Sequence, residues 1–184
     1  MSSYEAQKRV GTFEKVSELQ WVKDMIATDP DISRKHIGKA YDKIAIPERS
    51  TGESAGYDFR TPFAFELRPG ESIMIPTGIR CKIDNGHFLA LVPRSSVGIK
   101  RNTTLMNTIG VIDADYYNAK NEGHIMIVLQ NNNKSSIFSW ENKKRTWFAK
   151  ENERICQGIF LPYCITYDDQ VNTERKGGIG STGK

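Results

Sequence analysis

From residue 43 onward the chain is a succession of short apolar runs separated by turn-forming residues. The runs are rich in β-branched side chains, and clusters such as RPGE, DNG and QNNNKS separate them. Runs of this kind predict β-strands, and many of them without an intervening helical pattern predict an all-β domain, a barrel or a sandwich. The expected strands are 43–46, 72–76, 78–83, 87–92, 125–130 and 157–162.

Two further segments of this β region predict hairpins. The Asp84-Asn85-Gly86 sequence has the residue types that favour a tight turn between paired strands. Residues 131–150 are polar with embedded aromatic side chains. We interpret them as a longer hairpin and not as a linker.

The first 40 residues have a different pattern. Apolar residues recur between Phe13 and Ile26 at a spacing that covers one helical face, which predicts an amphipathic helix over 13–26. Proline and aspartate at 28–31 predict its end, and residues 33–43 form a second, shorter helix in this interpretation. We expect these helices to pack against their own domain, with binding to a partner protein as the alternative.

Length and charge limit the functions that need consideration. A chain of 184 residues with 38% apolar side chains suits one domain with an appendage. The net charge of +4 is modest and dispersed, so an anionic small molecule is a plausible partner and a nucleic-acid surface is not expected. No apolar run approaches the roughly 18 residues of a membrane span, and the first residues do not resemble a secretion signal.

The cysteines indicate a reducing environment. Cys81, Cys156 and Cys164 are odd in number, lack metal-ligand spacing and lie in apolar runs. We therefore expect reduced core thiols and an intracellular protein.

Residues 110–116, with the sequence GVIDADY, contain the strongest candidate for catalysis. The segment is expected to be a strand that runs into a turn, so Asp113 and Asp115 share one face. Two close carboxylates raise each other's proton affinity, which can produce a general base near neutral pH. The alternative is an Asp-rich turn whose carboxylates accept backbone N–H bonds.

Four other segments have the composition of binding loops. AGYD at 55–58 places a carboxylate after a small-residue turn, and ERICQ at 153–157 opens a strand with polar groups. PRSSVG at 93–98 combines a guanidinium, two hydroxyls and turn N–H groups, which could hold an anion or could be a solvated loop. The fourth segment is the Gly-rich stretch RKGGIGSTGK at 175–184.

The Gly-rich stretch also contains G-x-x-x-x-G-K. A nucleotide P-loop needs a preceding strand, a Ser or Thr after the lysine and a following helix, and this pattern is not found around residues 178–184. We expect instead a segment that becomes ordered over a ligand and contacts phosphate.

Taken together and in this order, the five motifs resemble those of the homotrimeric dUTP pyrophosphatase (dUTPase) family. The resemblance covers roughly residues 41–184. It implies a distorted jelly-roll β-barrel that forms trimers with active sites shared between subunits. It divides the chain into an N-terminal helical extension at 1–40, a β-barrel domain at 41–174 and a flexible lid at 175–184. The implied reaction is Mg²⁺-dependent hydrolysis of dUTP to dUMP and pyrophosphate, which limits uracil incorporation into DNA and supplies dUMP for thymidylate synthesis.

The resemblance also implies roles for individual residues. Asp113 would activate the attacking water, Asn107 would bind uracil, and Tyr116 would pack on the deoxyribose where a 2'-hydroxyl would clash. Asp58 would support Mg²⁺ through water, while the triphosphate itself chelates the ion. The remaining substrate-binding positions are Arg94, Ser95, Ser96, Gly98, Gly110, Gln157, Arg175, Gly178, Ile179, Gly180, Ser181 and Thr182.

Two departures from the family pattern concern the nucleoside pocket. Residues 117–124 lengthen the loop after Tyr116, where the family usually continues directly with a glycine and a Glu or Gln. Ile179 stands where the family usually has a phenylalanine over the base, so the lid lacks an aromatic face at that position.

Two functions compete with dUTP hydrolysis. A dCTP deaminase resembles this family but uses a glutamate in the strand that here ends at Gln130, and a glutamine cannot relay a proton. Zinc nucleobase deaminases are excluded because neither H-x-E nor P-C-x-x-C occurs. The non-enzymatic alternative is a regulatory relative that binds nucleotide or a partner protein through the N-terminal helix.

Overall fold

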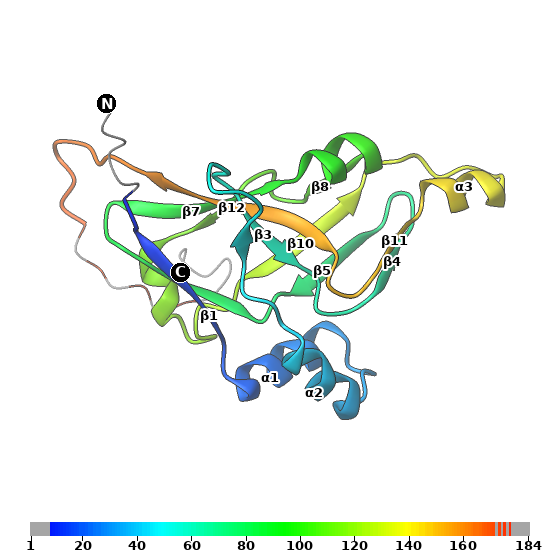
Figure 1. Ribbon diagram of the computed structural model, residues 1–184, viewed down its shortest axis with the longest axis horizontal. Coiled ribbons are helices and arrows are strands. Elements are labelled where there is room, and N and C mark those ends of the chain that lie inside the picture. The colour runs from blue at the N-terminus through cyan, green and yellow to red at the C-terminus, as the bar shows by residue number, and fades with distance from the viewer. Residues whose placement is uncertain (1–7, 172, 174, 176, 178–184) are drawn as a thin grey trace.

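The fold is built around a five-stranded antiparallel sheet (Figure 1). The coordinates are a computed structural model, which describes residues 8–171, 173, 175 and 177. The strands of this sheet, in spatial order, are β2 (Glu48–Arg49), β3 (Tyr57–Arg60), β12 (Arg154–Pro162), β7 (His87–Pro93) and β9 (Gly110–Ile112).

Three smaller antiparallel sheets complete the β structure of the described residues. One has the order β5 (Ser72–Pro76), β10 (Met126–Asn131) and β8 (Thr103–Leu105). The others pair β1 (Gly11–Lys15) with β6 (Ile79–Ile83), and β4 (Phe65–Leu67) with β11 (Trp147–Ala149). Alternate residues of β10 are buried and half-buried, as expected for a strand with one face on the core.

Helices α1 (Glu18–Thr28) and α2 (Arg34–Asp42) lie together on one side of the sheets, and α3 (Ser139–Arg145) lies at the far end of the molecule (Figure 1). Ser17 caps α1 by accepting a bond from the Gln20 N–H, and Ser33 caps α2 in the same way. The proline that follows α1 prevents its continuation. The predicted end of the first helix and the predicted second helix are therefore confirmed.

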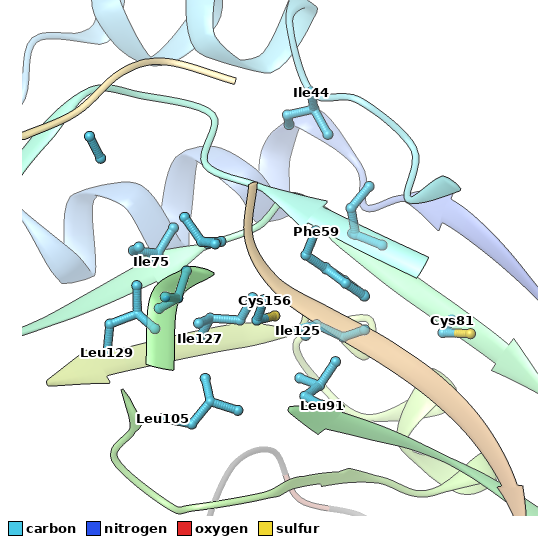
Figure 2. Packing of buried hydrophobic residues seen from close by; sticks show 14 of the residues in the cluster. Ile44, Phe59, Ile75, Cys81, Leu91, Leu105, Ile125, Ile127, Leu129 and Cys156 are labelled. Atoms are coloured by element: carbon cyan, nitrogen blue, oxygen red, sulfur yellow. The ribbon is translucent and has the colours of Figure 1, made fainter. Parts of the chain in front are cut away.

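A single buried cluster joins the sheets and the two N-terminal helices. Figure 2 shows part of this cluster, in which Phe59, Ile75 and Cys156 come from three different strands. Trp21 on α1 and Ile37 on α2 belong to the same cluster and are fully buried. The N-terminal segment thus packs against its own domain.

The beginning of the predicted first helix is wrong. Residues Gly11–Lys15 form β1, which pairs antiparallel with β6, and α1 starts only at Glu18. The strand places Phe13 against the rings of Tyr57, Phe59 and Phe160, with ring centroids 5.3 to 5.6 Å apart. Aromatic packing and strand pairing therefore override the helical spacing of this segment.

Five of the six predicted strands are confirmed, with ends shifted by up to three residues. The strand expected over 43–46 is wrong, because this segment leaves α2 as irregular chain. Ile44 within it is buried against Gly78, at a place where an added Cβ would collide with the isoleucine.

Both predicted hairpins differ from the structure. The Asp84–Gly86 turn exists, with Gly86 at φ +82, but β6 pairs with β1 while β7 pairs with β12 and β9. The turn therefore connects two sheets. Residues 131–150 contain α3 and the short β11, whose partner is β4.

The fold class is mostly β and not all-β. The described strands form separate sheets that do not close into a barrel, and three α-helices accompany them. No helix of the described residues has the length and apolar character needed to cross a membrane.

The cysteines are all free, but they differ in exposure. Cys81 and Cys156 are buried, as predicted, whereas Cys164 is exposed, so the expectation of a core thiol is wrong at that position. Burial raises the pKa of Cys81 to about 12 and also raises the pKa of Cys156. Both groups remain thiols at neutral pH, because the thiolate would have to exist in an apolar environment.

The burial of the N-terminal helix generates a stability prediction. Trp21→Ala removes a fully buried side chain and its hydrogen bond to the Ile37 carbonyl, and should lower the free energy of unfolding by about 3–5 kcal/mol. Leu19→Ala, an exposed position on the same helix, should change it by less than about 0.5 kcal/mol. Denaturant unfolding of both variants checks this, and equal effects would contradict the packing of α1.

The cysteine environments generate a second prediction. A disulfide reagent at pH 8 should modify Cys164 rapidly, while Cys81 and Cys156 should react only as the protein unfolds. Absorbance of the released thiol measures both phases. Cys164→Ser should abolish the rapid phase, and a second fast-reacting thiol in that variant would contradict the burial.

Candidate active site

The Asp113 loop begins where strand β9 ends. The pairing of Leu89 with Ile112 fixes β9 beside β7, and a short 3₁₀-helix (Ala114–Asn118) follows Asp113. Asp113 has an extended backbone and makes no side-chain capping bond to this helix. The predicted strand therefore ends at Ile112, and the turn that follows is helical.

One guanidinium holds the two carboxylates of this loop. Arg175 Nη1 lies 2.8 Å from Asp113 Oδ2 and 3.2 Å from Asp115 Oδ1. Both carboxylates therefore face the same way, as predicted. Partial burial lowers the pKa of Arg175, but the hydrogen bonds that its guanidinium donates to both carboxylates outweigh this effect, and the pKa is raised overall.

A mostly apolar pocket of about 360 Å³ opens beside the loop. Four predicted substrate-binding residues line it: Asn107, Gly110, Tyr116 and Arg175. A Cβ at Gly110 would lie 3.0 Å from Leu91 Cβ, so a larger residue would press on the pocket wall. Sequence reasoning missed the apolar lining, whose members are Met74, Leu91, Leu105, Met106, Val111, Ile112, Met126, Ile127 and Val128. Apolar walls with few polar groups are typical of small-molecule sites.

Tyr116 lines this pocket, and separate contacts hold its ring and its hydroxyl. Its ring lies 5.0 Å from the Arg175 guanidinium carbon, within the range of a cation–π contact. Its hydroxyl donates to the His124 carbonyl at 2.9 Å and accepts from Asn121 Nδ2 at 2.8 Å. Burial raises the pKa of the phenol, so the hydroxyl keeps its proton at neutral pH.

The RSS turn and Gln157 form a second hollow. The turn follows β7, and the N–H groups of Val97 and Gly98 both donate to the Arg94 carbonyl, which makes the turn compact. Gln157 on β12 lies close enough to Gly56 that a Cβ there would collide with its amide. Arg94, Ser95, Ser96 and Gln157 line a hollow of about 390 Å³ together with Ile99 and Lys100.

Asp58 holds the guanidinium of Arg94, one of the residues that line this second hollow. Its side chain is only 6% exposed, and its two oxygens bind Arg94 Nε at 2.7 Å and Arg154 Nη1 at 3.0 Å. The Ser50 hydroxyl adds a third bond at 2.9 Å. A buried carboxylate needs such partners, and in return it fixes the guanidinium of the RSS turn.

Comparison with known proteins assigns the family. The sequence model of the dUTPase family matches residues 42–183. A deoxyuridine 5'-triphosphate nucleotidohydrolase of Lactococcus lactis is 38% identical over 143 residues, which cover 76% of this chain and 89% of the relative. The chain belongs to the dUTPase family.

Solved structures agree with this dUTPase assignment. The Streptococcus mutans dUTPase has a TM-score of 0.59 at 29% identity, with 84% of this chain and 97% of that chain covered. The dUTPase of Staphylococcus bacteriophage 80alpha, solved with dUPNHPP, has a TM-score of 0.56 at 25% identity, with 77% and 94% covered.

Within this dUTPase chain the predicted site residues form two groups. One surrounds Asp113 and the apolar pocket, and the other surrounds the RSS turn, and the two hollows share no lining residue. Gly98 lies in the short π-helix Ser96–Lys100 behind the second group. Gly178, Ile179, Gly180, Ser181 and Thr182 lie outside the described residues.

The described residues contain no group of three or more His, Cys, Asp or Glu side chains that could hold a metal ion. Asp58 already binds two arginines. This donor set does not fit a resident Mg²⁺, but it suits an ion that arrives already chelated by phosphates.

The residues that sequence reasoning missed are partners of predicted residues. Ser50 and Arg154 hold Asp58, and Asn121 holds Tyr116. Arg154 lies within the ERICQ motif, so its motif was a usable signal. No sequence motif marks Ser50 or Asn121, because only the tertiary structure brings them to their partners.

Proposed function

We propose that this chain hydrolyses dUTP to dUMP and pyrophosphate, and so limits uracil incorporation into DNA and supplies dUMP for thymidylate synthesis. The observation that carries the proposal is that Asp113 directly follows Ile112 and binds Arg175, two residues that line the same pocket as Asn107 and Tyr116. The activity named for the Lactococcus relative and the bound dUPNHPP of the phage enzyme support it. Free cysteines suit a reaction inside the cell.

The chemistry assigned to Asp113 is general-base catalysis. Its carboxylate takes a proton from water, and the resulting hydroxide oxygen forms a bond to the α-phosphorus. The bond between that phosphorus and the bridging oxygen breaks, and pyrophosphate leaves with the electron pair. Asp113 is half exposed, so water can reach it.

Nucleoside recognition is assigned to the apolar pocket. Asn107 is exposed at its rim and can present its amide to the uracil edge. We assign to the buried ring of Tyr116, which lines the pocket, the contact with the deoxyribose and the exclusion of a 2'-hydroxyl. Selection against UTP therefore depends on steric exclusion at Tyr116.

Phosphate binding is assigned to the RSS turn with Gln157, and to Arg175. Arg94, Ser95 and Ser96 offer charge and hydroxyl donors in one hollow. The phosphates of dUTP would chelate Mg²⁺, which would supply neutralisation of their charge. Arg175 is bound to Asp113 and Asp115 in the single chain, and the phosphates of dUTP would compete for it.

We also propose the jelly-roll arrangement and a homotrimer with shared sites. The sheets meet in one core, which suits a distorted barrel, although the strands here do not close. The phosphate hollow and the Asp113 pocket share no lining residue. Neighbouring subunits would join the two, and the segment after residue 174 would cross between chains.

A deaminase on the same fold is disfavoured by the residue at the end of β10. Gln130 lies there, paired with Ser72 and Thr104 of the neighbouring strands. Its amide neither loses nor gains a proton near neutral pH, so it cannot relay one. Incubation with dUTP, dCTP, dTTP and UTP, read as pyrophosphate and as ammonia, distinguishes the two reactions.

The general base is tested by Asp113→Asn. Turnover should fall by roughly 10² to 10⁴ because the amide cannot accept the proton, while dUTP should still bind because the shape is kept. Single-turnover kinetics and equilibrium binding measure the two effects.

The matched control for the base is Asp115→Asn. Asp115 contacts the same Arg175 nitrogen but lies two residues after Asp113, as the second residue of the 3₁₀-helix. This variant should lose much less activity. Near-native turnover of Asp113→Asn would disprove the assignment of the base.

Mixing two inactive chains tests whether the C-terminal segment of one subunit reaches the site of another. One carries Asp113→Asn, and the other is truncated after Glu174. If the segment crosses between subunits, hybrid trimers contain some intact sites and recover part of the activity. Light scattering should show a trimer. A fully active monomer would disprove shared sites, and a trimer without recovery would place Arg175 at its own Asp113.

A further inference from the structure

The N-terminal helix and the inserted loop at 117–124 meet at a buried histidine. His124 is fully buried, and its Nδ1 lies 2.6 Å from Asp24 Oδ2 on α1. Its Nε2 accepts the Gly78 N–H at 2.7 Å. Because Nε2 is an acceptor, the ring proton lies on Nδ1 and is donated to Asp24. Both ring nitrogens are therefore fixed, and the ring cannot turn without breaking a bond.

Two further contacts fasten the inserted loop to the N-terminal segment. The backbone N–H and the hydroxyl of Ser17 donate to the two oxygens of Glu122 at 2.8 and 2.6 Å. The Tyr117 hydroxyl donates to Glu14 at 2.7 Å. Burial raises the pKa of Glu122, but the bonds from Ser17 outweigh it and the pKa is lowered. The loop is thus attached at three of its eight residues.

The same loop determines where Tyr116 lies. The Tyr116 hydroxyl is bound by the carbonyl of His124 and the amide of Asn121. Gly123 adopts φ +70, and a Cβ there would lie 2.6 Å from the Tyr116 carbonyl oxygen. The loop therefore wraps tightly around Tyr116. A continuous set of contacts leads from Asp24 through His124 to the tyrosine ring.

The family match covers only one of the two segments that meet at His124. The dUTPase model matches residues 42–183, which include the loop and Tyr116 but not Asp24 or Ser17. The family usually has a shorter connection after this tyrosine. The longer loop found here needs external support, and the N-terminal segment provides it.

We propose that Asp24 and His124 are positioning residues that set the sugar selectivity of the pocket through Tyr116. This rests on the proposed dUTP hydrolysis. A tyrosine excludes a 2'-hydroxyl only while its ring is held in place, and steric selection weakens when the ring can retreat. The N-terminal extension then contributes to the selection of deoxyribose over ribose.

The experiment measures the ratio of kcat/KM for dUTP to that for UTP. Asp24→Leu replaces the acceptor for His124 by an apolar side chain of the same branching, and should reduce the ratio by about tenfold, the equivalent of one lost hydrogen bond to a charged group. Asp24→Asn keeps an acceptor oxygen and should restore most of the ratio. His124→Leu should act like Asp24→Leu, and the double variant should be no worse than either single variant.

A purely structural role predicts different results. Met25→Ala, next to Asp24 but directed into the core, is the matched control, and should lower the melting temperature without changing the ratio. Hydrogen exchange of residues 114–124 should accelerate in Asp24→Leu and not in Met25→Ala. An unchanged ratio in Asp24→Leu, or unchanged exchange in that segment, would overturn the inference. A wild-type chain that releases no pyrophosphate from dUTP would instead overturn the proposed function, while exchange still reports on the support of the loop.

Discussion

Strand β12 pairs along both of its edges, and the arrangement of the site depends on this pairing. Gln157 lies opposite Asp58 of β3 on one side and opposite Val92 of β7 on the other. The next strand in the sheet, β9, leads to Asp113. Since side chains alternate between the faces of a sheet, a register shift of one residue would turn Gln157 away from the RSS turn. Register along β12 therefore controls the relative position of three motifs.

Three guanidinium groups near the two hollows, those of Arg94, Arg154 and Arg175, are paired with carboxylates. Asp58 would be costly to bury alone, and the two arginines that compensate it come from the RSS turn and from β12 itself. Arg175 serves the two carboxylates at the other hollow in the same way. A triphosphate is rich in negative charge and would compete for such guanidinium groups, so the free chain holds them in ion pairs that a ligand can replace. In the free protein these guanidinium groups are therefore held by carboxylates.

Local sequence patterns predicted much of the β structure but not the pairing of its strands. Alternating and β-branched runs located β5, β6, β7, β10 and β12, and the Ser33 cap agrees with the predicted second helix. The Asp84-Asn85-Gly86 turn was also predicted, yet its flanking strands pair elsewhere. A turn sequence reports only local dihedral preference, while the partner of each strand depends on which apolar faces must be buried together. The helix prediction was wrong at residues 11–15 for the same reason, because packing of Phe13 in an aromatic cluster favours the strand over the helix.

The sequence by itself determined the family, the five motifs and the identity of the candidate base, because these depend on residue types in a fixed order. Only the tertiary structure decided what these residues touch. Arg175 and Asp113 are 62 positions apart, and Asp24 and His124 are 100 apart. Contacts over such separations follow from the packing of whole elements, which local propensity does not encode. The bond between His124 and Asp24 of the N-terminal helix is a contact of this kind.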